Sequence, residues 1–285
     1  MERLMTPVIM QGFFFCLCFA IWKVTSVRLP KEGDSAAMLF SSAQREPTSE
    51  YVSCVEREEE LGRLRNQAKI RKPMLVFGPE GVGKSRLLRA FVENQPFALY
   101  VAQMRAPREF LLGLLHALHS EDPEIEVPKN GGTLTTSSFK GIVHRALDTK
   151  PFLMVLDHLA APSRVVTGMI KDLHYYGRTP VIFASRSPHM EDIGALRSLC
   201  ANKSERLEVK NWPLSIALEF ARREAEKIQL CASNLETILP ALVEWSDGNP
   251  GAILQMLKMA HLPQYRANDQ IKAHVLYLDY RMGRH

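Results

Sequence analysis

Short apolar runs alternate with longer amphipathic segments between residues 73 and 209 of the chain. The segments between the apolar runs have helical spacing, while the runs themselves are too short for helices and rich in strand-forming residues. Strands that are apolar on both faces occur in parallel sheets covered by helices on each side. The pattern therefore predicts an α/β fold with a parallel sheet sandwiched by helices. The predicted strands are 73–77, 97–102, 152–156, 180–184 and 206–209, and the predicted helices are 85–94, 109–119, 137–147 and 164–176.

The strand pattern stops at Trp212-Pro213, which we interpret as a hinge. Helical spacing then returns in three segments, at residues 214–229, 233–245 and 251–260. Residues 261–285 predict a further helix with a short strand-like end at 274–280. Their interleaved Tyr, Arg and Lys side chains could alternatively contact nucleic acid. We therefore expect two domains, an α/β domain at 51–210 and a smaller helical domain at 211–285.

The N-terminus carries a separate signal, a run of nineteen residues with few polar side chains at positions 4–22. As a helix this run would be about 28 Å long, close to the hydrocarbon thickness of a bilayer. It predicts a membrane anchor within residues 1–23, and the basic residues after it place the C-terminal body in the cytoplasm. A cleaved signal peptide, or an upstream start codon with Met38 as the true start, are the alternatives. Residues 24–50, rich in Ser, Pro, Gly and charge, predict a linker.

Composition and charge narrow the function only a little. The chain has 285 residues, of which 46% are hydrophobic and 24% charged, which is ordinary for a globular protein. A formal net charge of +5 permits contact with nucleic acid or an anionic membrane but requires neither. The five cysteines are widely scattered without zinc-ligand spacing, so we expect reduced thiols.

A glycine-rich run lies between the first predicted strand and the helix after it. Glycines let the backbone wrap closely around phosphate, with amide N–H groups and the helix dipole directed at the anion. A lysine that follows supplies positive charge to the β- and γ-phosphates, and a serine hydroxyl binds magnesium. The motif in this strand–loop–helix context predicts a nucleoside triphosphate site for ATP with Mg²⁺. Its members are Gly78, Pro79, Glu80, Gly81, Val82, Gly83, Lys84, Ser85 and Arg86.

Asp157 stands at the end of the third predicted strand, where phosphate-loop proteins hold magnesium directly or through water. Ser85 and Asp157 are therefore the predicted magnesium ligands. His158 occupies the place at which many such ATPases carry a second acid that activates the attacking water. A histidine can act as a base near neutral pH, and Glu80 in the loop is an alternative base. Binding with slow or no hydrolysis is thus an open alternative to an active ATPase.

Ser185 and Arg186 follow the fourth predicted strand, at the sheet edge where ligands of open α/β folds bind. Either side chain could sense a γ-phosphate, and a solvent-facing loop pair is the alternative. The predicted catalytic residues are Lys84, Asp157, His158 and Arg186.

Several of these segments resemble AAA+/STAND-type ATPases. Residues 55–61 are similar to the acidic lead-in of that family, with Val55-Glu56 in place of its glycine. Residues 152–158, Ala184-Ser185-Arg186 and Gly248-Asn249-Pro250 are similar to its Walker B, sensor 1 and helical-lid motifs, in the same order. The resemblance covers about residues 51–260, and it implies a P-loop NTPase fold with a C-terminal helical lid.

The resemblance also implies a mode of action. In the family the lid proline and the lead-in helix lie at the adenine pocket, which would put Pro250 near the base. Family members are nucleotide-driven switches, often homo-oligomers, coupled to a protein effector that is unknown here. Arg197 and Arg206 are the candidates for an arginine that acts on a neighbouring subunit, and His158 departs from the family pattern.

The sequence thus predicts a Mg-ATP-binding P-loop ATPase that acts as a nucleotide-dependent switch. Three alternatives accompany it: a switch with little or no hydrolysis, a DNA-associated helper ATPase of the transposition or replication-loader type, and a small-molecule phosphotransferase. The third is disfavoured because the chain has no insert with clustered arginines. The lack of a guanine-reading Asn-Lys-x-Asp run favours adenine over guanine.

Overall fold

The computed structural model describes residues 57–102, 106–128 and 135–283 of the chain. The predicted anchor at 4–22 and the predicted linker at 24–50 lie outside these residues. Within the described ranges, none of the helices is long and apolar enough to cross a membrane.

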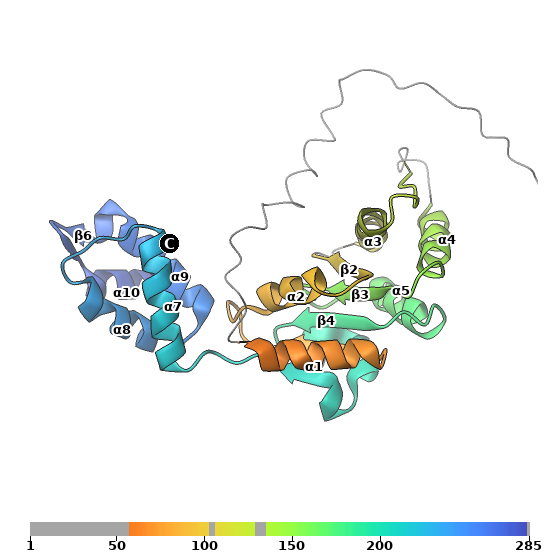
Figure 1. Ribbon diagram of the computed structural model, residues 1–285, viewed down its shortest axis with the longest axis horizontal. Helices are drawn as coiled ribbons and strands as arrows, with labels where there is room; N and C mark the ends of the chain where they lie inside the picture. Colours follow the sequence, from red (N-terminus) through yellow and green to blue (C-terminus); the bar gives the residue numbers. More distant parts are fainter. Residues whose placement is uncertain (1–56, 103–105, 129–134, 284–285) are drawn as a thin grey trace, which may run out of the picture. The chain divides into compact units, whose positions relative to one another are not determined.

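A five-stranded sheet forms the centre of the N-terminal half, and all of its neighbouring strands run parallel. The strand order is β2-β3-β4-β1-β5, so the first strand lies inside the sheet between two later ones. This confirms the predicted α/β class and each of the five predicted strands (Figure 1). The strands are β1 Met74–Phe77, β2 Ala98–Val101, β3 Leu153–Leu156, β4 Val181–Ser185 and β5 Arg206–Glu208.

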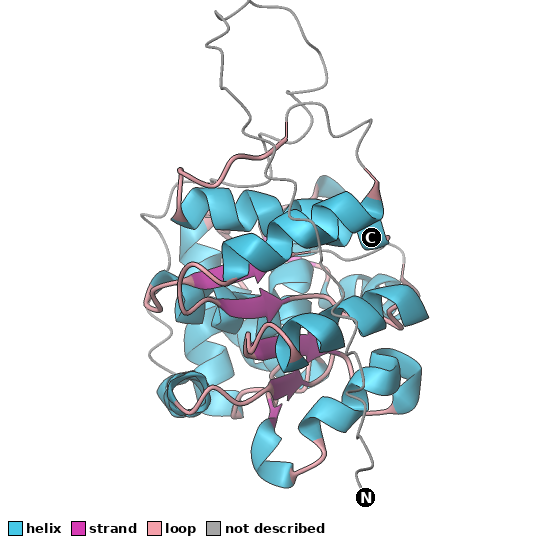
Figure 2. Cartoon of the chain, turned by 90° about the vertical axis from the view of Figure 1, so that its right-hand side faces the viewer, coloured by secondary structure: helices cyan, strands magenta, loops and turns pink. Residues whose placement is uncertain are grey.

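Helices cover both faces of the sheet because successive side chains of each strand point to opposite faces. Leu75, Met154 and Phe183 belong to the apolar cluster under the first group of helices. Val76 and Ile182 belong to the cluster on the other face. Figure 2 shows the strands between these helical layers. The first group is α3 Pro107–Glu121, α4 Thr136–Leu147, α5 Arg164–Tyr175 and the 3₁₀ helix η3 Gly194–Cys200, and the second is α1 Glu58–Lys69 and α2 Lys84–Glu93.

The helix starts follow from local sequence. Thr135 and Ser163 cap α4 and α5, since each side-chain oxygen accepts a hydrogen bond from a backbone N–H three residues on. Pro107 is the first residue of α3, where its missing N–H costs nothing. This helix therefore begins two residues before the predicted start at residue 109. Short connections after β4 are formed by α6 Met190–Ile193 and the 3₁₀ helix η4 Lys203–Glu205.

The C-terminal part is helical and has an apolar cluster of its own. Its helices are α7 Leu214–Lys227, α8 Leu235–Trp245, α9 Pro250–His261 and α10 Ala273–Arg281, with the 3₁₀ helix η5 Pro263–Tyr265 and the two-stranded pair β6 Arg266–Ala267 and β7 Gln270–Ile271 between the last two.

The prediction of a strand-like end at residues 274–280 is wrong, because this segment is the helix α10. Its apolar run is short, and a short run fits either period. Ala273, Leu276 and Tyr280, spaced three and four residues apart, all contact the C-terminal apolar cluster. That spacing places them on one side of a helix, so packing against the cluster decides between the two structures.

Candidate functional site

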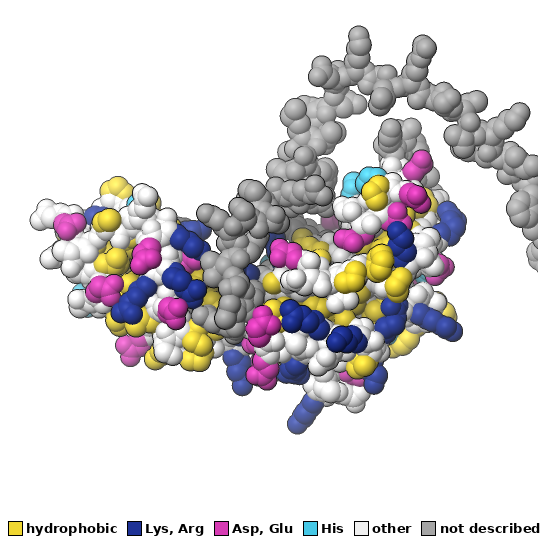
Figure 3. Space-filling view, viewed as in Figure 1, with side chains coloured by type: hydrophobic (Ala, Val, Ile, Leu, Met, Phe, Trp, Pro, Cys, Tyr) yellow, Lys and Arg dark blue, Asp and Glu magenta, His cyan; other side chains and the backbone are white. Residues whose placement is uncertain are grey.

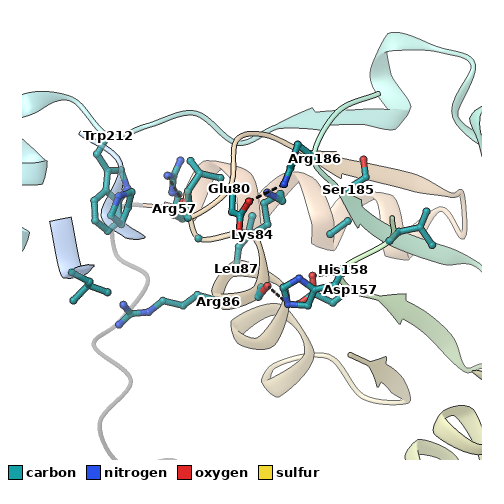
Figure 4. A pocket seen from close by; sticks show the side chains of 18 of the residues that line it. Arg57, Glu80, Lys84, Arg86, Leu87, Asp157, His158, Ser185, Arg186 and Trp212 are labelled. Atoms are coloured by element: carbon teal, nitrogen blue, oxygen red, sulfur yellow. Dashed lines mark hydrogen bonds and ion pairs between the residues drawn. The ribbon is translucent and has the colours of Figure 1, made fainter. Parts of the chain in front are cut away.

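A cavity of about 670 Å³ opens at the carboxyl end of β1, where the predicted phosphate loop leads into α2 (Figure 4). The carboxyl ends of parallel strands are where open α/β sheets bind ligands. Arg57 and Trp212 lie at one end of the cavity, His158 and Asp157 at the other, and Lys84 between them. The other lining residues are Glu80, Gly81, Val82, Gly83, Ser85, Arg86, Leu87, Leu159, Ala160, Ala184, Ser185, Arg186, Asp192, Phe220, Arg223, Pro250 and Leu254.

The loop glycines are required for reasons that differ from one position to the next. Gly83 has a φ of 98°, which favours glycine, and it caps the N-terminus of α2. Gly81 has a φ of 78°, and a Cβ there would lie 2.6 Å from Oδ1 of Asn249. A Cβ on Gly78 would lie 2.2 Å from the carbonyl oxygen of Val209. Gly78 and Gly81 therefore also permit close contacts with other parts of the protein, which the motif alone does not reveal.

Lys84 folds back over the loop that precedes it. Its ammonium donates hydrogen bonds of 2.8 Å to the carbonyl oxygens of Gly78 and Pro79. Burial lowers the pKa of Lys84, and the nearby carboxylates of Asp157 and Glu80 act in the opposite direction. The ammonium thus stands in the middle of the cavity, held by backbone carbonyls and between two acids.

Asp157 is fixed by two hydrogen bonds at the end of β3. The carboxylate is only 1% exposed. Its Oδ2 accepts a 2.6 Å hydrogen bond from the phenol of Tyr100 on β2, and its Oδ1 accepts one of 2.8 Å from the backbone N–H of His158. Burial, together with the Asp157 charge, raises the pKa of the Tyr100 phenol well above its ordinary value, so this group stays a donor.

Ser85 and Asp157 are brought together around the imidazole of His158. His158 Nε2 lies 3.2 Å from the Ser85 hydroxyl oxygen and 3.5 Å from Oδ2 of Asp157. A hydroxyl and a carboxylate are oxygen donors of the kind that Mg²⁺ prefers, so the two side chains fit the predicted metal. The backbone of His158 has a φ of 50°, in the left-handed region that few residues other than glycine adopt.

Ser185 is the last residue of β4 and Arg186 follows it, and only the Arg186 side chain contacts the phosphate loop. The Arg186 guanidinium donates a 2.8 Å hydrogen bond to the Glu80 carboxylate (Figure 4), in an ion pair whose side chains are 71% and 85% exposed. Such an exposed pair contributes little to stability and can rearrange readily. The Ser185 hydroxyl instead donates to the carbonyl of Ser187 at 2.6 Å, and the residue is buried.

Arg57 and Trp212 form the opposite end of the cavity, and motif reasoning did not single them out as ligand contacts. Arg57 is buried, and it donates to the carbonyl oxygens of Val82 at 3.3 Å and Lys210 at 2.7 Å. Its guanidinium also lies 5.5 Å from the ring centroid of Trp212. Arg57 belongs to the acidic lead-in segment, which was the only signal in the sequence for its position. Trp212 was predicted as a hinge and lies in the wall of the site.

Helix α9 is hydrogen-bonded directly to the phosphate loop. The Gly251 N–H donates to the Gly81 carbonyl at 2.9 Å, and the Asn249 amide donates to the Glu80 carbonyl at 2.9 Å. The Asn249 Oδ1 also caps α9 by accepting from the Ala252 N–H at 3.1 Å. We call these bonds between residues 80–81 and residues 249–251 the loop–α9 contact. It brings Pro250 to the lining of the cavity.

The two arginines predicted to act on a neighbouring subunit do not line this cavity in the described part of the chain. Arg206 is engaged locally, since its guanidinium donates to the carbonyl oxygens of Cys200 at 2.8 Å and Ala201 at 3.3 Å. Arg197 lies in η3 and is exposed.

Comparison with solved structures identifies the fold. The chain is similar to the Orc1 protein of Aeropyrum pernix, solved in complex with DNA, at 14% identity and a TM-score of 0.56, covering 80% of this chain and 65% of that one. It is similar to Cdc6p of Pyrobaculum aerophilum at 14% identity and a TM-score of 0.55, covering 84% and 66%. A Walker-type ATPase of Pyrococcus abyssi matches at 17% identity and a TM-score of 0.54, covering 80% and 72%.

These likenesses confirm that the chain has the fold of AAA+/STAND-type P-loop ATPases, as its motifs predicted. The chain spans only about two thirds of the length of the Orc1 and Cdc6p chains, 65% and 66%. No protein-family model matches the sequence, and no curated protein matches it.

Tyr100→Phe tests whether the hydrogen bond to Asp157 holds the site together. The substitution removes the donor to a buried carboxylate, so we expect the free energy of unfolding to fall by about 1–3 kcal/mol. Urea denaturation followed by circular dichroism measures the loss. Tyr277→Phe is the matched control, because the Tyr277 ring packs on Trp245 and loses only a hydroxyl. An equal loss of unfolding free energy in the two variants would contradict the stabilising role of the Tyr100–Asp157 hydrogen bond.

Proposed function

We propose that this chain binds ATP with Mg²⁺ and acts as a nucleotide-dependent switch. The observation that carries the proposal is that a single cavity is lined by the phosphate loop, by the acid that ends β3 and by helix α9. A ligand that fills this cavity touches both the α/β part and the helical part of the chain. Such a ligand shifts a conformational equilibrium when it binds one arrangement of the two parts more tightly than another.

The phosphates would lie along the loop between Gly78 and Ser85. Lys84 already stands in the cavity as an ammonium close to two carboxylates, and the loop amides at the N-terminus of α2 supply further positive potential. Arg86 lines the same cavity and adds a further cation next to Lys84 in the chain. Ser85 and Asp157 would hold Mg²⁺, which neutralises charge on the β- and γ-phosphates when bound. Arg186 would exchange Glu80 for a phosphate oxygen, since its present ion pair is exposed.

The base would lie at the other end of the cavity, between Trp212 and Pro250. An aromatic ring and a proline ring offer flat apolar surfaces to a purine. Arg57 orders this wall, because it binds the loop carbonyl of Val82 and stacks near Trp212 at the same time. We infer that adenine is the base, given that the sequence has no guanine-reading motif.

Hydrolysis is proposed to be slow. His158 stands where a second carboxylate would activate water, and its imidazole Nε2 contacts Ser85 and Asp157. The other candidate base, Glu80, is paired with Arg186 unless Arg186 turns to a phosphate oxygen. Neither group is thus an unpaired acceptor for the proton of a water molecule before nucleotide binds.

The switch itself would act through the loop–α9 contact. Its two hydrogen bonds join the backbone of the phosphate loop to the first turn of α9, with no flexible side chain between Gly81 and Gly251. A shift of the loop on exchange of ATP for ADP would therefore be passed to α9 and the helices packed on it.

Lys84→Ala tests nucleotide binding. Removing the ammonium takes away the central positive charge of the cavity, so we expect the affinity for ATP to fall by at least about tenfold, a loss of roughly 1.4 kcal/mol. Fluorescence anisotropy of a labelled ATP measures the affinity, and phosphate release in the same samples measures turnover. Lys258→Ala, an exposed lysine of α9, is the control and should bind normally. Equal binding by wild type and Lys84→Ala would refute the proposed site.

Gly251→Ala tests the loop–α9 contact. A Cβ at this position would lie 2.6 Å from the Gly81 Cα, and backbone atoms must separate to admit it. We expect nucleotide to protect α9 amides from hydrogen exchange in the wild type and to lose much of that effect in the variant. Gly168→Ala in α5, where a Cβ meets nothing within 4 Å, is the matched control. Unchanged protection in Gly251→Ala would mean that the contact does not transmit the nucleotide state.

A DNA-associated function is the second candidate, favoured by the basic side chains on α1 and the turn after it. Arg63, Lys69, Arg71 and Lys72 are exposed there, and Figure 3 shows Lys and Arg side chains gathered along this part of the surface. The similar Orc1 protein was solved in complex with DNA. Acidic side chains lie at the start of α1 and interrupt the basic surface, so the proposal ranks below the switch.

Lys69→Glu combined with Lys72→Glu tests this candidate. If the surface binds phosphates, affinity for duplex DNA should fall with rising salt, and the double variant should bind at least about tenfold more weakly. Fluorescence anisotropy with a labelled duplex at several salt concentrations measures both effects. Lys227→Glu combined with Lys258→Glu, in the C-terminal helices, controls for net charge. An equal loss in the two double variants would indicate only non-specific attraction.

A further inference from the structure

We propose that His158 is a third protein ligand of the divalent cation, and that it tunes the site toward transition-metal ions such as Mn²⁺ over Mg²⁺. The inference deepens the proposed function, because it rests on the placement of the cation at Ser85 and Asp157. It changes the role of His158 from a substitute base to a metal ligand with a nitrogen donor.

The positions of three donor atoms carry the proposal. Nε2 of His158 lies 3.2 Å from the Ser85 hydroxyl oxygen and 3.5 Å from Oδ2 of Asp157 (Figure 4). Adjacent ligands of an octahedral ion with bonds of about 2.1 Å lie about 3.0 Å apart. The imidazole nitrogen is thus about 0.2 and 0.5 Å farther from the two oxygens than ligands sharing one ion would be. A small approach of the side chains would close these gaps.

The backbone at His158 favours this orientation. Its φ of 50° is a costly conformation for a residue with a Cβ, and such conformations concentrate at functional sites. The conformation is held by the hydrogen bond from the His158 N–H to Oδ1 of Asp157, at 2.8 Å. That bond ties the histidine to the carboxylate, so the ring and Oδ2 are presented on the same side. The side chain is 64% exposed, and packing in the core therefore does not explain the strain.

The surrounding charges agree with a nitrogen ligand. Asp157 supplies the one carboxylate among these three donors, whereas a second acid at position 158 would make the site one charge more negative. A neutral imidazole lowers the attraction for a hard ion such as Mg²⁺, which prefers oxygen donors. The same nitrogen suits first-row transition metals, whose affinity for nitrogen ligands is higher.

Coordination of a cation by His158 would slow the hydrolysis of ATP. A ring nitrogen whose lone pair binds a cation cannot accept a proton from water at the same time. His158 as a ligand therefore implies slow hydrolysis, because its ring nitrogen would not be available as the base.

Pulsed electron paramagnetic resonance on the full chain tests the inference directly. Mn²⁺ is added alone and with ADP, and the spectrum is examined for nitrogen-14 coupling from a bound imidazole. We expect the coupling in the wild type and its loss in His158→Asn. Asparagine tolerates the left-handed backbone, so the variant should keep the local fold. His189→Asn, on the loop after β4 and outside the cavity lining, should retain the coupling.

Metal competition supplies a second measurement. We expect His158→Asn to lower the affinity for Mn²⁺ by at least about tenfold and to leave the affinity for Mg²⁺ nearly unchanged. Bound Mn²⁺ without nitrogen coupling, or no Mn²⁺ bound in either condition, would overturn the inference. If ADP does not bind but Mn²⁺ shows the His158-dependent coupling, the nucleotide proposal fails while the metal ligand stands. If ADP and Mn²⁺ bind without the coupling, the nucleotide proposal survives and this inference fails.

Discussion

The hydrogen bond from the Gly251 N–H to the Gly81 carbonyl is the contact on which the arrangement of the site depends. It requires two backbones to approach so closely that a Cβ on Gly251 would lie 2.6 Å from the Gly81 Cα. Only glycine at both positions allows this. The contact joins the loop that is expected to hold phosphate to the first turn of α9, and the Asn249 amide reinforces it through the Glu80 carbonyl. Without it, Pro250 would have no fixed position relative to the loop.

Arg57 has a matching role at the far wall of the cavity. Its buried guanidinium binds the carbonyls of Val82 and Lys210, and so joins the segment before α1 to the phosphate loop and to the segment that leads into α7. A buried charge is tolerated only when its donors are satisfied, and here the Glu60 carboxylate at 2.8 Å supplies a further acceptor. The requirement for satisfied donors restricts how the three segments can lie. The loop–α9 contact and Arg57 thus fix the two walls between which a base would fit.

Much of this fold could be predicted from the sequence, since the decisive information is local. Five apolar runs gave the strands, and the loop at 78–85 and Asp157 could be placed from their position at strand ends. That α10 is a helix could not be predicted, because its short apolar run fits the spacing of a helix and of a strand alike. Its packing on the C-terminal cluster decides between the two. Tyr100 and Trp212 were missed for another reason. Each acts through a partner far along the chain, Asp157 and Arg57, and no local pattern reports such pairs.

His158 likewise has contacts that its position in the sequence does not report. His158 stands at the position where an acid would activate water. Its position therefore suggests only one role, that of a base in place of this acid. In the structure, the His158 ring lies against Ser85 and Asp157, and its backbone N–H is hydrogen-bonded to the Asp157 carboxylate. These contacts allow a different role, that of a metal ligand. A side chain that binds the cation stabilises the nucleotide-bound state. A catalytic base instead lowers the barrier to hydrolysis, which ends that state. Coupled to the loop–α9 contact, slow turnover would hold α9 in one state for as long as the nucleotide stays. Under the proposed function, such a chain would respond to nucleotide exchange, as a switch does.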